Sequence, residues 1–489
     1  MSDSLKQKTF SGLLWNFVEN FSLQGFGFIQ GIILARLLTP SDYGLIAMVG
    51  VFFSISHCFI DSGFTSALIR KKNRTDIDYS TVYVTNITLS FFFALILYIC
   101  SAYIANFYKE PLLEDIVKIN AILLFLGAFI AVQGTRLTIN LEFKTKSIIN
   151  VVATIITGIT TIILAILDFG VWALIYPNFI SLVIRGYLYW YYQHWVPKLN
   201  FSLNSFYEFF NFGYKLLATN LLISIYNNIY SLIIGKKYNS TEVGYYSKAE
   251  GYPALISGTV TGVIGKTTFP VLCQLTDNMN ILINVYRKMT KMTCFLVFPL
   301  LMGLCALAKP LIIILITEKW EASITYMQIL CFAIMLNPIS QLNYNLLSAL
   351  GKSDYIFKVE LYKRIICVLI LFISIPFGIK IACIGYVFSS FISIIINFYY
   401  IYKTTKISIN NQVKDIIPFM LYSISMLIII LLANKIFNNY VHQLIIGLII
   451  GTTYYFIISY FTKSPELNYI KSLTLNYFQK VKSKCPSKS

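Results

Sequence analysis

The chain has 489 residues, of which 57% are hydrophobic and only 12% are charged, and its mean hydropathy is +0.69. Because a soluble globular chain carries roughly 25% charged residues, this composition excludes a water-soluble fold, and the aromatic content of 16% excludes a disordered chain. The formal charge of +18 comes from scattered residues with no long basic block, so we predict no nucleic-acid partner.

Apolar runs long enough to cross a bilayer recur along the whole chain. A membrane-spanning helix needs about 20 mostly apolar residues. Candidate spans lie at 11–35, 44–67, 82–106, 116–140, 148–167, 170–192, 209–234, 244–270, 292–316, 324–349, 358–378, 381–402, 416–434 and 441–462. The sequence therefore predicts an all-α polytopic membrane protein with about fourteen transmembrane helices and no soluble domain.

The basic residues predict the orientation of these spans. With the N-terminus placed in the cytoplasm, loops on the cytoplasmic side hold 25 of the 39 Lys and Arg residues, and loops on the other side hold seven. Basic residues accumulate in cytoplasmic loops. We therefore predict a multi-pass membrane protein with both termini in the cytoplasm.

The second half of the chain repeats features of the first half. At an offset of 200, Leu34 matches Ile234, Arg36 matches Lys236, Asp42 matches Glu242, and Gly44 matches Gly244. Six spans separate the copies, so both enter the membrane from the same side, and the repeat is parallel. The predicted organisation is a six-helix bundle at 1–192, a cytoplasmic linker at 193–208, a second six-helix bundle at 209–403, two extra spans at 404–462 and a basic cytoplasmic tail at 463–489.

Polar residues at helical spacing should line a cavity between these helices. Charged groups facing lipid cost about 2.5–3.5 kcal/mol each, so charged residues inside spans should face protein or water. The candidates for binding a substrate with an anionic headgroup are Arg136, Arg185, Lys215, Lys266, Gln133, Asn140, Gln341 and Asn345. The candidates for coupling to a proton or sodium gradient are Glu19, His57 and Asp61. For the amide residues, hydrogen bonding between helices is an equally good explanation.

Enzyme signatures are missing from the sequence. The fragments Gly265-Lys266-Thr267 and Gly351-Lys352-Ser353 lack the first glycine of a phosphate loop. None of the nine Cys forms a CxxC pair, so we predict no metal site. A glycan polymerase or ligase of the membrane would need a larger external loop than this chain offers. We predict a transporter without a catalytic site or a bound cofactor.

Two segments resemble the signatures of Wzx-type polysaccharide exporters. ARLLTPSDYGLIAM at 35–48 looks like the first signature of that family, and GTRLTINLEFKTK at 134–146 is similar to WzxC-like members. The family is related to MATE drug exporters and lipid II flippases, and the resemblance covers roughly residues 1–410. It implies two six-helix bundles arranged in a V, and flipping of an undecaprenyl-pyrophosphate-linked oligosaccharide held by cationic cavity residues such as Arg136.

The resemblance also gives a role to the first motif. Arg36, Pro40, Asp42 and Gly44 are expected to shape the turn between the first two spans, because Pro fixes φ and Gly tolerates close approach. The second copy has Ser240 in place of Pro40, so that turn is expected to be less rigid.

The leading hypothesis is a flippase for lipid-linked glycan precursors of O-antigen, capsule or exopolysaccharide, working by alternating access. Its expected partners are the lipid-linked oligosaccharide, membrane lipids and other polysaccharide-assembly proteins. The alternative is a MATE-like ion-coupled exporter of small organic molecules, whose cation site would call for net negative charge. A third hypothesis, a scaffold for glycan-assembly enzymes, does not account for the polar stripes.

Overall fold

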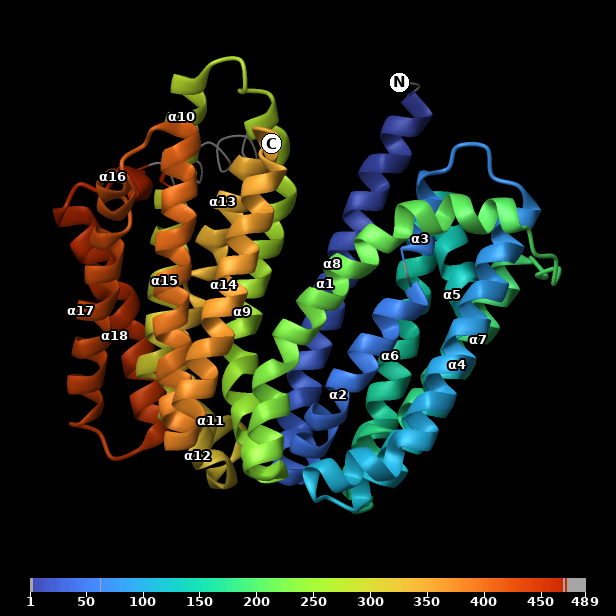
Figure 1. The fold of residues 1–489 in the computed structure, drawn as a ribbon. Coiled ribbons are helices and arrows are strands. Elements are labelled where there is room, and N and C mark those ends of the chain that lie inside the picture. Colours follow the sequence, from blue (N-terminus) through green and yellow to red (C-terminus); the bar gives the residue numbers. More distant parts are fainter. Residues whose placement is uncertain (1–2, 62, 469–470, 473–489) are drawn as a thin grey trace, which may run out of the picture. The chain divides into compact units, whose positions relative to one another are not determined.

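The computed structural model describes residues 3–61, 63–468 and 471–472, and these form helices joined by short connections, without a β-strand among them (Figure 1). The all-α prediction is therefore confirmed for this part of the chain. The contacts divide the chain into two units, 1–247 and 248–489, with the boundary inside α9 (Ser240–Cys273).

The first unit contains the helices of the predicted first bundle and the beginning of the predicted second bundle. Its elements are α1 (Asp3–Leu37), α2 (Pro40–Asp61), α3 (Phe64–Arg70), α4 (Asp76–Tyr108), α5 (Leu112–Ile139), α6 (Phe143–Ile166), the 3₁₀ turn η1 (Gly170–Leu174), α7 (Pro177–Gln193), α8 (Leu203–Lys237) and the first two turns of α9. Within it α4 packs along α5, α1 along α6, and α2 along α8.

The second unit holds the remaining elements. They are the rest of α9, α10 (Met279–Ala306), α11 (Ala308–Ile316), η2 (Glu318–Trp320), α12 (Glu321–Ile334), α13 (Asn337–Ala349), α14 (Ser353–Ser374), η3 (Ile375–Phe377), α15 (Ile379–Thr405), α16 (Ile409–Lys414), α17 (Ile417–Asn434) and α18 (Tyr440–Phe461). Here α14 packs along α15, and α10 along α17.

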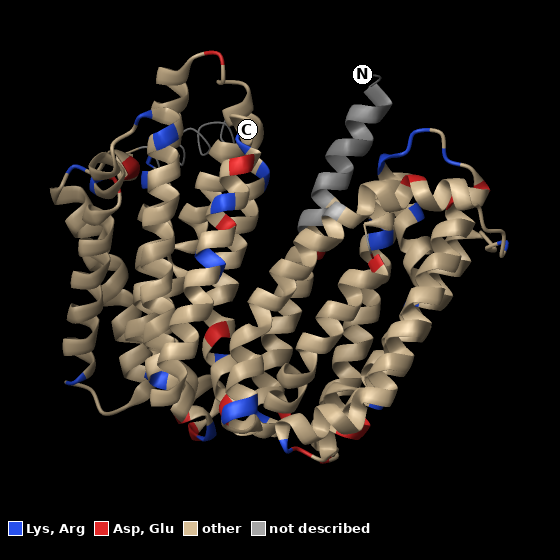
Figure 2. Cartoon of the chain, viewed as in Figure 1, with Lys and Arg blue, Asp and Glu red and all other residues tan. Residues whose placement is uncertain are grey.

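Each of the fourteen predicted spans coincides with a helix or a helix pair, and twelve segments of the described chain are long and apolar enough to cross a membrane. Charged residues lie mostly toward the helix ends (Figure 2). The helices α1 and α14 are not among the twelve. In α14 the first half carries Lys358, Glu360, Lys363 and Arg364, which leaves a short apolar stretch. The chain is a multi-pass membrane protein, and fourteen spans remain a prediction.

One predicted boundary is wrong. The sequence places a loop at 273–291 and a span at 292–316, but α10 begins at Met279, capped by the Asn278 side chain, which accepts from the Ile281 amide at 3.2 Å. The helix ends at Ala306, and a separate helix, α11, follows. Arg287 and its basic neighbours made the first turns look like a loop, although helical ends at the membrane surface tolerate such residues.

The duplicated motif forms a reciprocal contact inside the first unit. A Cβ atom placed on Gly44 would overlap the backbone carbonyl of Ser240, and one placed on Gly244 would overlap the carbonyl of Pro40. The hydroxyl groups of Ser41 and Ser240 are 2.8 Å apart. The N-terminal turns of α2 and α9 therefore meet backbone to backbone, with equivalent residues of the two copies in equivalent positions.

Candidate functional site

A cavity of about 460 Å³ lies inside the first unit, among α2, α3, α4, α5 and α7. This size falls within the roughly 300–1,000 Å³ typical of small-molecule sites. Its polar lining residues are His57, Asp61, Thr65, Asn86, Asn120, Asn178, Ser181 and Arg185. The structure therefore brings Arg185, predicted to bind substrate, together with the two predicted coupling residues His57 and Asp61.

Two lining groups retain unused hydrogen-bonding capacity. The Nε atom of Arg185 and the Oδ1 atom of Asn86 are both buried, and neither has a hydrogen-bond partner within the described chain. A buried polar atom without a partner costs about 1–3 kcal/mol. A ligand or water that bonds to these atoms would recover this energy, which makes them natural contact points for a polar substrate.

A second cavity of about 330 Å³ shares Thr65, Ala131 and Arg185 with the first. It is also lined by Thr135, Thr138, Lys146 and Tyr189, from α5, α6 and α7. The Lys146 ammonium donates to the Thr138 hydroxyl at 2.8 Å. Arg185 therefore lies where the cavities adjoin, and the charged residues lining the two are Arg185, Lys146 and Asp61, besides His57.

Glu19 lies outside both cavities but is connected to the second. Its carboxylate accepts from the Ser147 hydroxyl at 2.6 Å and from the Asn150 amide at 2.8 Å, which ties α1 to α6. The Asn150 carbonyl oxygen in turn accepts from the Tyr189 hydroxyl at 3.0 Å. Glu19 does not meet His57 and Asp61, and its contacts hold two helices together.

Arg136 lies in an aromatic cluster and not in either cavity. Its guanidinium carbon is 4.8 Å from the ring centre of Tyr79 and 4.8 Å from that of Trp195, and its Nε atom donates to Gln193 at 3.2 Å. Cation–π contacts of this kind contribute about 0.5–1 kcal/mol each. The guanidinium therefore ties α5 to the segment that follows α7.

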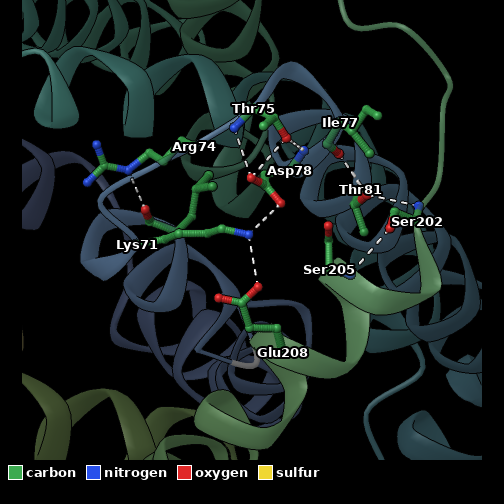
Figure 3. Close-up of polar contacts among 10 residues, drawn as sticks. Lys71, Arg74, Thr75, Ile77, Asp78, Thr81, Ser202, Ser205 and Glu208 are labelled. Atoms are coloured by element: carbon green, nitrogen blue, oxygen red, sulfur yellow. Dashed lines mark hydrogen bonds and ion pairs between the residues drawn. The ribbon is translucent and has the colours of Figure 1, made fainter.

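The same cluster fastens the beginning of α8 to α3 and α4. Its buried residues are Phe64, Ala67, Leu68, Val82, Tyr83, Val132, Trp195 and Phe209. Lys71 lies between two carboxylates, 3.0 Å from Asp78 of α4 and 2.9 Å from Glu208 of α8 (Figure 3). Partial burial lowers the pKa of Lys71, but the hydrogen bonds and charges of Glu208 and Asp78 outweigh this and raise it above 10.5. The predicted linker is thus anchored on the first unit.

The remaining predicted ligands are scattered. Gln341 and Asn345 bond to each other at 3.0 Å, and Asn345 donates to Thr268 of α9, so these amides join helices of the second unit. Lys266 is exposed on α9. Gln133 is fully buried, and its side-chain atoms have no partner in the described chain. The side chain of Lys215 lies outside the described residues.

Asn140 and the residues of the first motif lie at helix ends. Asn140 is the exposed residue after α5, and its amide donates to Glu142 at 3.3 Å. At the other motif, Asp42 accepts from the amide and hydroxyl of Thr39 at 2.8 and 2.7 Å, at the start of α2. Pro40 is the first residue of this helix, and Arg36 is exposed in the last turn of α1.

The lining residues that sequence reasoning missed include Asn86, Asn120, Asn178 and Lys146. Asn86 and Asn120 are each isolated in an apolar span, whereas Asn178 shares one face of α7 with Ser181 and Arg185 at i, i+3 and i+7. Lys146 falls in a predicted loop, but α6 already begins at Phe143. Isolated Asn residues in apolar spans are the signal that could have indicated these positions.

The chain matches the model of a family described as "Polysaccharide biosynthesis protein" over residues 33–325. It is 25% identical to the teichuronic acid biosynthesis protein TuaB of Bacillus subtilis, over 72% of this chain and 74% of that protein. It is 24% identical to the lipopolysaccharide biosynthesis protein WzxC of Escherichia coli, over 74% of each chain. In fold it resembles the lipid II flippase MurJ in an inward closed conformation, with a TM-score of 0.73 and 16% identity over 92% of this chain and 99% of that one.

Proposed function

The chain belongs to the polysaccharide biosynthesis protein family, as a membrane transporter of the WzxC and TuaB type with a MurJ-like fold, and we propose that it flips an undecaprenyl-pyrophosphate-linked oligosaccharide across the bacterial plasma membrane. The translocated oligosaccharide would supply surface polysaccharide synthesis outside the membrane. Alternating access would expose the headgroup site first to the cytoplasm and then to the other side.

The position of Arg185 is the observation that carries this proposal. A pyrophosphate diester carries about two negative charges, and its transfer through hydrocarbon without compensation costs many kcal/mol. Arg185 can grip a phosphate through two parallel hydrogen bonds, and Lys146 adds a point charge in the same second cavity. The amides and hydroxyls of the first cavity would then bind the adjoining sugar, since sugars present many hydroxyl groups for such partners.

His57 and Asp61 are proposed to couple transport to an ion gradient. Both line the first cavity with Arg185, and they are one turn apart on α2. A carboxylate that shares a cavity with an arginine interacts with it electrostatically, so protonation of Asp61 or its binding of sodium would change the charge that the substrate meets. A proton or sodium gradient would in this way control how the substrate phosphates bind to and leave Arg185.

The proposed topology has fourteen spans in two parallel six-helix repeats, with two further spans and both termini in the cytoplasm. Support comes from the coincidence of every predicted span with a helix, from the reciprocal contact of Gly44 and Gly244, and from the distribution of basic loops. Reporter fusions at Tyr440 and at the C-terminus test it, because the topology requires them to report opposite sides.

A bacterial strain that lacks its own polysaccharide flippase tests the proposed function in cells. The chain should restore surface glycan when the strain makes a matching precursor, and Arg185→Ala should abolish this at normal membrane abundance. Arg185→Lys should retain part of the activity. Export by Arg185→Ala at the wild-type level would contradict the proposed headgroup site.

The alternative function is MATE-like export of small organic molecules. Asp61 in the first cavity is the observation that favours it, because a carboxylate attracts organic cations. Arg185 and Lys146 oppose it, since together they exceed the single carboxylate. Resistance to cationic dyes that depends on Asp61 and persists in Arg185→Ala would favour this alternative.

A further inference from the structure

A groove of about 540 Å³ lies in the second unit, along the first turns of α10. Its lining residues are Asn284, Val285, Arg287, Lys288, Met289, Lys291, Met292, Pro465 and Glu466. We infer that this groove binds the headgroup of an anionic phospholipid, which makes it a lipid site separate from the transport cavities.

The charges of the groove favour one phosphodiester. Arg287 donates from Nε and Nη2 to the two carboxylate oxygens of Asp415, at 2.6 and 2.8 Å, and Lys291 lies 3.2 Å from the same carboxylate. Asp415 is only 5% exposed, whereas Arg287 and Lys291 remain 33% and 38% exposed. Arg287 and Lys291 therefore remain accessible beside Lys288, whereas the Asp415 carboxylate that orients them is buried.

Glu466, the carboxylate that lines the groove, also has a hydrogen-bond partner. Glu466 is 7% exposed and accepts from the Ser464 hydroxyl at 2.7 Å. Three cations thus stand against two covered carboxylates, Asp415 and Glu466. The cations that line the groove outnumber its lining carboxylate, Glu466, which favours an anionic group such as a phosphodiester.

The proposed topology puts the groove at the depth of lipid headgroups. Asp415 comes two residues before α17 begins at Ile417, and Pro465 comes four residues after α18 ends at Phe461. The candidate spans here are Ile409–Asn434 and Tyr440–Phe461, so Asp415 lies near the beginning of one span and Pro465 just after the end of the other. The proposed topology places both of these ends at the cytoplasmic surface of the membrane. Basic pockets between transmembrane helices at the cytoplasmic side are typical binding places for anionic headgroups.

Apart from Asn284, the remaining walls are apolar. Val285, Met289, Met292 and Pro465 line the groove beside the cations. Flexible Met side chains adapt to irregular apolar partners, such as the upper acyl chains of a lipid. A free phosphate would use the cations alone and leave this apolar surface in water.

The chain's own tail is a poor occupant of the groove. Residues 473–489 carry four Lys and no Asp or Glu, so their charge repels a cationic groove. An anionic lipid is complementary both to the groove and to that tail.

The test measures binding of phosphatidylglycerol to the purified full-length protein in detergent, by native mass spectrometry and by thermal stabilisation. Phosphatidylcholine, inorganic phosphate and free glycerophosphoglycerol serve as parallel ligands. Phosphatidylglycerol should bind and stabilise more than the other three. Equal effects from phosphatidylcholine would overturn the charge argument, and equal effects from either soluble anion would overturn the assignment to a lipid.

Lys288→Gln is the variant, because it leaves the bond between Arg287 and Asp415 intact. The affinity for phosphatidylglycerol should fall about fivefold, as expected for one cation near an anionic membrane surface. Lys352→Gln removes an equally exposed Lys of the second unit outside the groove and should bind as the wild type does. Wild-type affinity in Lys288→Gln, or an equal loss in Lys352→Gln, would overturn the site.

Discussion

Gly44 and Gly244 are 200 residues apart and each lies against the backbone of the other's helix, at the carbonyl of Ser240 for Gly44 and of Pro40 for Gly244. The contact has the symmetry expected when two copies of one motif pack together. A side chain on either glycine would collide with backbone atoms, which cannot rotate away as side chains do. The glycines of the repeated motif are therefore required by this close approach.

Gly44→Ala is predicted to destabilise the protein. Overpacking costs about 1–3 kcal/mol, and a collision with backbone belongs at the upper end of that range. Thermal unfolding in detergent and membrane abundance should both show the loss. The matched control is Gly50→Ala on the same helix, where a Cβ meets no atom within 4 Å, and it should be neutral or slightly stabilising. Equal behaviour of the two variants would refute the close approach.

Arg136→Ala is predicted to lower protein abundance and stability. The change removes two cation–π contacts and a hydrogen bond to Gln193, a loss of about 1–2 kcal/mol. Quantitative immunoblotting of membranes and thermal unfolding measure it, with Lys72→Ala at an exposed position as the control. Loss of export at normal abundance and stability would instead support the substrate-binding role predicted from the sequence.

The two ion pairs of Lys71, with Asp78 and with Glu208, should contribute differently to the free energy of unfolding. Lys71→Met leaves Asp78, whose side chain is 2% exposed, without its cation and should cost about 1–3 kcal/mol. Glu208 is 57% exposed, so Glu208→Gln should cost less than about 1 kcal/mol.

The pH dependence of the Lys71 contribution follows from its raised pKa. The stabilisation is fully present below the ordinary Lys value and is lost as the pH rises through the raised value, above 10.5. The difference in unfolding free energy between wild type and Lys71→Met should stay constant from about pH 6 to 9. A steep change within that window would show that another group is responsible.

Asp61→Asn is predicted to uncouple transport from the ion gradient while the fold is retained. The amide has nearly the shape of the carboxylate but carries no negative charge. Transport by the variant should become insensitive to imposed proton and sodium gradients. The outcome that would exclude a coupling role is a wild-type response to both gradients, with Asp42→Asn as a control at the start of the same helix.

Apolar runs identified the helices well, because about 20 apolar residues in a row have few alternatives to a membrane span. They failed near Arg287, where α10 already begins at Met279 and its first turns carry basic residues typical of a loop. The site was harder to predict. Arg185 could be identified as an in-span cation, but Asn86, Asn120 and Asn178 come from three helices, and only their packing brings them together. Arg136 was predicted to line the cavity but packs against Tyr79 and Trp195 instead. The sequence does not reveal these partners, because both are distant from Arg136 along the chain.

The central claim is that this chain moves a pyrophosphate-linked glycan past Arg185. The most direct measurement reconstitutes wild type and Arg185→Ala in proteoliposomes that contain a fluorescent undecaprenyl-pyrophosphate-linked sugar. A membrane-impermeant reductant then reports which leaflet holds the headgroup. The account predicts that wild-type vesicles expose the inner-leaflet pool to the reductant, whereas Arg185→Ala vesicles behave like protein-free ones. Equal exposure in wild-type and Arg185→Ala vesicles, at equal protein content, would contradict it.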